Sequence, residues 1–267
     1  MFNSFFLQQI VLQGSFNHPL DQFEIYVLFE YFPNINMPPA MAMFTNLTLF
    51  CIFIVMSIRF LFFVSLVQVP NLILRSCVFV LNILYTTVKT IIKNNMSLMR
   101  NQYFITLFFA FLFILIANCI GLLPYSFTVT SSFAVTFFLA LSHFIGINII
   151  SLVQHRWETL TVLLPDNVPV LIMPFLILIE LVSYFARVFS LSIRLFANMM
   201  SGHALLKILT GFTYSLLGFT TGLILLSIIP WVVVTGLMFL ETLIAYLQAY
   251  VFVILLAVYI NDSLIFH

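Results

Sequence analysis

The sequence predicts an all-α polytopic membrane protein. Of its 267 residues, 63% are hydrophobic and only 6% are charged, whereas soluble domains carry about 25% charged residues. The apolar runs are long and lack the roughly ten-residue alternation of membrane barrel strands, so helices must satisfy the backbone in lipid. About five membrane helices plus one amphipathic interfacial helix are therefore expected.

Residues 1–39 are expected to form an external N-terminal segment. They contain three acids and no Lys or Arg, and prolines at 33, 38 and 39 prevent a helix from starting earlier. The remainder, 40–267, is expected to form a single membrane domain.

The first membrane span is expected at 40–69, closed by Pro70. This run exceeds the ~20 residues that a helix needs to cross a bilayer. Arg59 lies in its inner half. We expect Arg59 either to snorkel to the interface or to pair with a neighbouring helix.

Residues 71–100 are expected to form the interfacial helix. At 100° per residue, most of their polar side chains fall within about 40° of Arg75, on a stripe that Phe79 interrupts. The stripe begins just before these residues, at Gln68, and continues with Asn71, Arg75, Asn82, Thr86, Lys89, Lys93, Ser97 and Arg100. Four cations without an acid favour a helix lying at the membrane surface. A second span capped by basic residues is the alternative.

Two ordinary spans follow, at 103–123 and 133–153. The first is uncharged and ends in N-C-I-G-L-L-P, whose glycine and proline mark the exit of the helix. By the positive-inside rule, the acidic N-terminal segment faces outward and the basic 70–102 segment inward. The uncharged loop at 125–132 is then outside and Arg156 inside, so every short loop agrees with this topology.

The last two helices are expected at 168–213 and 222–260 and to form a hairpin. The first, some 45 residues, would be about 68 Å long, against a hydrocarbon core of about 30 Å. Both helices must therefore tilt steeply, curve or break. Gly211 and Gly218 mark the expected end of the first. A reading as two ordinary hairpins would need polar turns near the middle of each tract, which the sequence lacks.

Arg194 stands within the first of these tracts, where an arginine costs roughly 2.5 to 3.5 kcal/mol at a helix centre. We therefore expect it to be functional and to have a partner. Its face is small and polar and includes Glu180, Ser183, Arg187, Ser190, Asn198 and Ser201. Glu180 lies about 21 Å away along the axis and cannot pair with it. His203 points to the opposite side.

The last helix carries a second polar lane, in which Glu241, Ala245, Gln248 and Phe252 share one face. Glu241 also needs a partner, for which the hairpin offers His203 or water in a channel. Arg194 and Glu241 could form a packing pair, or they could belong to an ion pathway. The residues alone favour neither interpretation.

Four stretches of the chain resemble subunit a of the F-type ATP synthases, the membrane stator that conducts protons to the rotor ring. They are H-P-L-D-Q-F-E-I at 18–25, N-x-x-G-L-L-P at 118–124, S-L-S-I-R-L-F-A-N-M-M-S-G-H at 190–203 with I-E at 179–180, and E-T-L-I-A-Y-L-Q-A-Y-V-F at 241–252. The resemblance covers roughly 18–262. It departs at Asp166 and Asn167, where many relatives carry glycine.

The resemblance implies a non-catalytic stator subunit with two half-channels that face a ring of subunit c, while ATP is made or hydrolysed in a soluble catalytic sector. Arg194 would separate the half-channels, because a permanently charged guanidinium favours the ionised form of a carboxylate that passes it. Gln248 would approach Arg194 from the last helix.

The other implied proton-translocation residues divide between the two half-channels. Glu241 and His203 match positions that line the outer half-channel. Glu180, Ser190 and Asn198 match positions on the inner side.

The resemblance also implies the partners: the subunit c ring, other membrane and peripheral-stalk subunits, the bilayer and protons. No cofactor, metal or nucleic acid is expected. A secondary transporter or channel is an alternative, but the sequence lacks an internal repeat. A haem-binding subunit would need facing histidine pairs, which the five histidines do not offer within one span.

The location expected is the mitochondrial inner membrane, with the N-terminus toward the intermembrane space. No Lys or Arg precedes Arg59, which argues against a transit peptide or a positively flanked signal peptide. The 33 phenylalanines suit an AT-rich organelle genome. A bacterial plasma membrane is the alternative.

Overall fold

The computed structural model describes residues 21–29, 44–66, 72–96, 100–123, 126–155, 173–219 and 224–264. Within these residues, six helices are long and apolar enough to cross a membrane. They are α2 (Asn46–Leu66), α3 (Leu72–Asn95), α4 (Arg100–Gly121), α5 (Phe133–His155), α6 (Met173–Phe219) and α7 (Ile224–Leu264). The prediction of an all-α polytopic membrane fold is confirmed.

A short antiparallel sheet precedes the first long helix. Strand β1 (Val27–Phe29) pairs with β2 (Phe44–Thr45), and a 3-10 turn, η1 (Asp21–Phe23), lies just before it. The backbone N–H of Thr45 donates to the Thr48 hydroxyl at 3.0 Å, and that of Thr48 to the Thr45 hydroxyl at 3.4 Å. This reciprocal cap fixes the helix start at Asn46. The helix thus begins six residues after the approximate start expected for this span, residue 40.

Helix α3 has the amphipathic character that the sequence predicts. Arg75, Asn82, Thr86, Lys89 and Lys93 are all exposed. On the other side, apolar side chains including Leu81, Val88 and Ile92 are buried against the neighbouring helices. The polar stripe thus faces away from the protein, as an interfacial helix requires. Its depth in the membrane remains a prediction.

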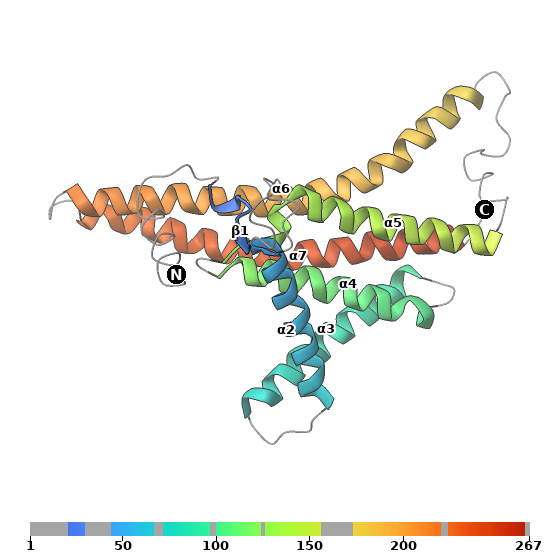
Figure 1. The fold of residues 1–267 in the computed structure, drawn as a ribbon, viewed down its shortest axis with the longest axis horizontal. Helices are drawn as coiled ribbons and strands as arrows, with labels where there is room; N and C mark the ends of the chain where they lie inside the picture. Colours follow the sequence, from blue (N-terminus) through green and yellow to red (C-terminus); the bar gives the residue numbers. More distant parts are fainter. Residues whose placement is uncertain are drawn as a thin grey trace.

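Helices α4, α5, α6 and α7 form the main body (Figure 1). Helices α6 and α7 run antiparallel as the expected hairpin, and the N-terminal part of α6 diverges from α5 and α7. Helix α6 has 47 residues and continues through Gly211 to Phe219, so Gly211 does not mark its end. The expected start of this helix, at 168, lies outside the described residues.

The core lies where α4 and α7 pack together. Phe111, Leu112 and Ile114 of α4 are fully buried, as are the small residues Ala249 and Ala257 of α7. Small residues let membrane helices approach closely, and packing rather than hydrophobicity drives their association in lipid. This contact fixes α7 relative to α4.

A 3-10 turn, η3 (Val129–Ser131), follows α4 and is buried against α4, α5 and α6. Its three residues and the preceding Thr128 are each less than 6% exposed. The loop that the sequence predicts at 125–132 is thus packed within the protein in its described part, 126–132. It brings polar side chains close to the long helices.

Candidate functional site

Arg194 lies on an exposed face of α6. Its Nη2 donates to the Ser190 hydroxyl, one turn earlier, at 3.4 Å. Among the described residues, no carboxylate lies within ion-pair distance of the guanidinium. The structure thus contains no packing pair between Arg194 and Glu241. No described carboxylate thus neutralises this exposed guanidinium.

The surface around Arg194 is built from small side chains. Ser183, Ala186, Ser190, Ala197 and Ser201 are all exposed and lie within about 80° of Arg194 on the helix. Small residues let another helix approach the backbone closely. This stripe is continuous along α6 on both sides of Arg194.

His203 and Glu241 meet across the hairpin. The Nε2 atom of His203 lies 3.5 Å from Oε1 of Glu241, and their side chains are only 15% and 5% exposed. At this separation the two groups face one another without a strong hydrogen bond. Of the two partners that the sequence offers for Glu241, the structure shows His203.

A glycine makes room for this pair. A methyl group added at Gly202 of α6 would lie 2.8 Å from Oε1 of Glu241, which is too close for non-bonded atoms. The carboxylate of Glu241 therefore lies directly against the backbone of α6. Only glycine allows this approach without a shift.

Further polar side chains reach the same region from α4 and the segment after it. A methyl group added at Gly121 would lie 2.7 Å from Thr128 Cγ2 and 3.8 Å from His203 Nε2, so both side chains lie beside Gly121. Asn118 is fully buried and its Nδ2 donates to the Ala245 carbonyl, one turn after Glu241, at 3.2 Å. These groups form a polar patch inside an apolar bundle.

Several atoms of this patch have no hydrogen-bond partner among the described residues. They are Asn118 Oδ1, Thr128 Oγ1, His203 Nε2 and both carboxylate oxygens of Glu241. Buried polar groups generally obtain their partners from protein or ordered water. These five atoms are therefore buried polar groups that need partners from outside the described residues.

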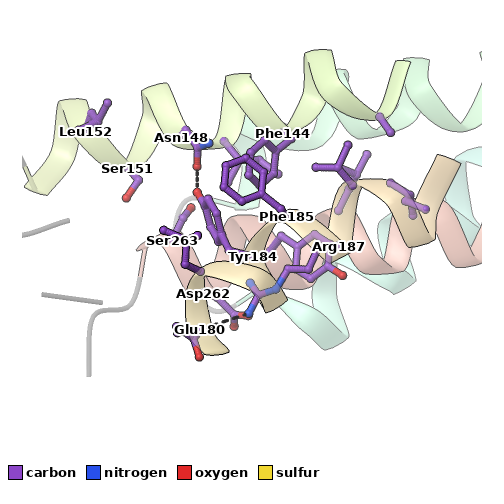
Figure 2. A pocket seen from close by; sticks show the side chains of 17 residues that line it. Phe144, Asn148, Ser151, Leu152, Glu180, Tyr184, Phe185, Arg187, Asp262 and Ser263 are labelled. Carbon is purple, nitrogen blue, oxygen red and sulfur yellow. Dashed lines mark hydrogen bonds and ion pairs between the residues drawn. The ribbon is translucent and has the colours of Figure 1, made fainter. Parts of the chain in front are cut away.

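A second polar region lies where α6 diverges from α5 and α7. A cavity of about 430 Å³ is lined by residues of all three helices, among them Glu180, Arg187, Tyr259 and Asp262. Nη2 of Arg187 lies 3.9 Å from Oε1 of Glu180, and its guanidinium lies 5.3 Å from the centre of the Tyr259 ring. Figure 2 shows Glu180, Arg187 and Asp262 close together at one side of the cavity.

The wall of this cavity on the α5 side is mostly apolar but includes Asn148 and Ser151. The Tyr184 hydroxyl of α6 donates to Oδ1 of Asn148 on α5 (Figure 2). This bond ties α5 to α6 at the point where the helices begin to separate. The cavity thus has two carboxylates at one side and an amide–phenol pair at the other.

Two of the predicted residues, Gln248 and Asn198, remain to be placed. Gln248 is half-buried on α7, and Asn198 is half-buried on α6. The main-chain carbonyl of Asn198 accepts a hydrogen bond from the Ser201 hydroxyl at 3.3 Å. The structure thus brings together His203 with Glu241 and Arg194 with Ser190, whereas Glu180 pairs with Arg187 and not with Arg194.

Sequence reasoning missed the contributions of Asn118, Gly121 and Thr128 to the patch around Glu241. The signal was present in N-C-I-G-L-L-P, where a buried asparagine and a glycine are three residues apart. In the sequence this stretch indicates the end of a helix and a resemblance to the family, but no contact with Glu241 or His203. Asp262 was also missed, because a single acid near the end of a predicted span resembles a solvated helix terminus.

Comparison with known proteins identifies the family. The sequence profile of the family described as ATP synthase A chain matches residues 46–261. ATP synthase subunit a of Chondrus crispus is 42% identical over 252 residues, covering 93% of this chain and 96% of that protein. The subunit a proteins of Pelagibacter ubique and Acanthamoeba castellanii are 40% and 38% identical, covering 94% and 92% of this chain, and 98% and 96% of their own lengths. The chain belongs to the ATP synthase A chain family.

Proposed function

We propose that this chain is the proton-conducting stator subunit of a rotary F-type ATP synthase. It would form two half-channels and couple proton flow to rotation of a ring of subunit c, without itself making or hydrolysing ATP. Family membership supports a role in the membrane part of an ATP synthase. The single observation that carries the mechanism is the exposed Arg194, which no described carboxylate of the chain neutralises.

Arg194 would act as the barrier between the half-channels. A carboxylate on a ring helix that reaches the guanidinium is favoured in its ionised form. It therefore releases its proton before passing Arg194 and cannot carry it straight across. The exposed small residues on both sides of Arg194 leave space for ring helices to pass.

The outer half-channel would run through the patch around Glu241 and His203. Its buried oxygens and nitrogens offer successive acceptors and donors for a proton in an otherwise apolar bundle. Asn118 would hold α7 in place through the Ala245 carbonyl, so that the carboxyl of Glu241 stays opposite His203.

The inner half-channel would run through the cavity at Glu180. Ser190 and Asn198 would continue this path toward Arg194, and Gln248 would approach Arg194 from α7. The supporting observation is that a cavity with two carboxylates lies between α5, α6 and α7. It is separate from the patch at Glu241.

The driving force would be the membrane potential together with the pH difference. Moving one charge across 100 mV is worth about 2.3 kcal/mol. The partners proposed are the subunit c ring, other membrane subunits and the peripheral stalk. A single membrane domain over 40–267, placed in the mitochondrial inner membrane with its N-terminus toward the intermembrane space, is the arrangement that we favour.

Replacement of Arg194 tests the proposal. In the reconstituted complex, we expect Arg194→Gln to abolish ATP synthesis driven by a proton gradient while the complex still assembles. Arg75→Gln on the exposed stripe of α3 is the matched control and should retain synthesis. A normal rate of ATP synthesis by Arg194→Gln would overturn the proposal.

A further inference from the structure

Arg59, like Arg194, is an arginine within a candidate membrane span, but the proposed proton path does not use it. It lies on α2, within the candidate span 46–65, and is exposed. Among the described residues, no carboxylate lies within ion-pair distance of it. A charged side chain at this position in a span calls for a partner.

Arg59 interrupts a face of α2 that is otherwise apolar. At 100° per residue, Ile52, Val55, Met56 and Phe63 lie within about 60° of it. All four are exposed, by 48% to 62%. On the other side of α2, Ile54 and Ile58 are buried against residues of α4 and the segment after it. Helix α2 thus packs one face against this chain, and none of the described residues covers the other face.

Lipid alone would cover the apolar part of this face but not the guanidinium. Arg59 lies six residues before the end of the candidate span, about 9 Å along the axis from Ser65. Side chains of a helix lean toward its N-terminus. The N-terminal end of the span in α2 is farther from Arg59 than its C-terminal end. Arg59 therefore leans toward the middle of the span and away from the nearer surface.

The surroundings of Arg59 agree with this direction. It lines a shallow hollow of about 260 Å³ together with Cys51, Ile52, Val55 and Met56, all of which precede it in the helix. The hollow is apolar apart from the guanidinium. It suits a packed side chain that ends in an acceptor, rather than a solvated lipid headgroup.

We propose that this face of α2 is the binding surface for a membrane-spanning helix of another subunit, which carries an Asp or Glu at the depth of Arg59. The apolar residues on either side of Arg59 would pack against that helix, and the carboxylate would accept hydrogen bonds from the guanidinium. Such charge-assisted bonds with two parallel N–H donors are specific in geometry. This surface is separate from the faces of α6 and α7 that carry the proton pathway.

Photo-crosslinking in the intact complex tests the surface. A photoreactive phenylalanine analogue at Ile52 is compared with the same analogue at Phe53, because the two positions are similarly exposed, at 53% and 56%, but point about 100° apart. After irradiation of native membranes, we expect Ile52 to form an adduct with a membrane subunit that has an acid within its span. The yield at Phe53 should be several-fold lower.

Three outcomes of this experiment would overturn the proposal. They are adducts with lipid alone at Ile52, adducts with a subunit that has no acid in its span, and adducts with an acidic segment of this same chain, such as the parts around Glu30, Glu158 or Asp166. A signal from all exposed positions alike would equally contradict a specific surface.

Replacement of Arg59 gives an independent measure. In the purified complex, we expect Arg59→Gln to raise the dissociation constant of the crosslinked subunit about tenfold, as is typical for contacting residues that couple. Arg59→Lys should raise it less, and exchange of the charges, Arg59→Glu with Lys at the partner's acid, should restore binding in part. Unchanged binding by Arg59→Gln would overturn the proposal. Complexes that retain the partner should pump protons normally, so this test is independent of the proposed function of Arg194.

Discussion

His203 Nε2 and Glu241 Oε1 lie 3.5 Å apart across the α6–α7 hairpin, both nearly buried. The two residues lie on antiparallel helices, so their contact depends on how α6 and α7 are aligned along their lengths. Because Glu241 is held against the backbone at Gly202, the register cannot shift without moving the carboxylate. Three experiments follow from this region and from the cavity at Glu180.

Glu241 and Glu180 should control access from opposite sides of the membrane. We expect Glu241→Gln to slow passive proton flux and to remove most of its dependence on outer pH, while the dependence on inner pH remains. Glu180→Gln should have the converse effect. The measurement is proton flux through the reconstituted membrane part at varied pH on one side. Identical pH responses of the two variants would contradict two separate half-channels.

Gly202 and Gly211 offer a matched pair of substitutions within one helix. We expect Gly202→Ala to force Glu241 to move and to destabilise the hairpin by about 1–3 kcal/mol, as overpacking does. Gly211→Ala has no neighbouring atom within 4 Å and should be neutral or stabilising, because alanine favours helices. Thermal dissociation of the subunit and proton flux would be compared. Equal effects of both variants would show that the close approach at Gly202 does not matter.

Asn118 should stabilise α7 through the Ala245 carbonyl. We expect Asn118→Ala to lower the stability by about 1 kcal/mol, since interhelical hydrogen bonds in membranes are modest. Proton flux through the outer half-channel should fall by more than this small loss of stability explains, because Glu241 lies one turn from Ala245. Asn82→Ala on the exposed face of α3 is the control. A loss of stability without a loss of flux would assign Asn118 a structural role only.

The long helices and their faces could be predicted from the sequence. The apolar runs predict each span, and 100° per residue places Arg194 and His203 on opposite sides of α6. The structure agrees, since Arg194 is exposed and His203 points to α7. Periodicity suffices here because side-chain direction within one helix is set by local geometry.

Contacts between distant segments could not be predicted in this way. Nothing in the composition of the sequence predicts the pairing of β1 with β2. The approach of Thr128 and Gly121 to His203 depends on how three helices pack, which a single sequence does not fix. The end of α6 was placed too early because a glycine disfavours a helix by about 1 kcal/mol, and tertiary packing overcomes so small a preference.

The length of α6 also determines where a proton would enter and leave. Glu180 and His203 are 23 residues apart on this one helix, about 35 Å along its axis, which is more than the roughly 30 Å of a hydrocarbon core. Both can lie within the membrane only if α6 is inclined, and the two openings are then displaced sideways. In the proposed mechanism, a proton that crosses by this route would be carried laterally between the two openings, so its passage would be tied to movement in the plane of the membrane.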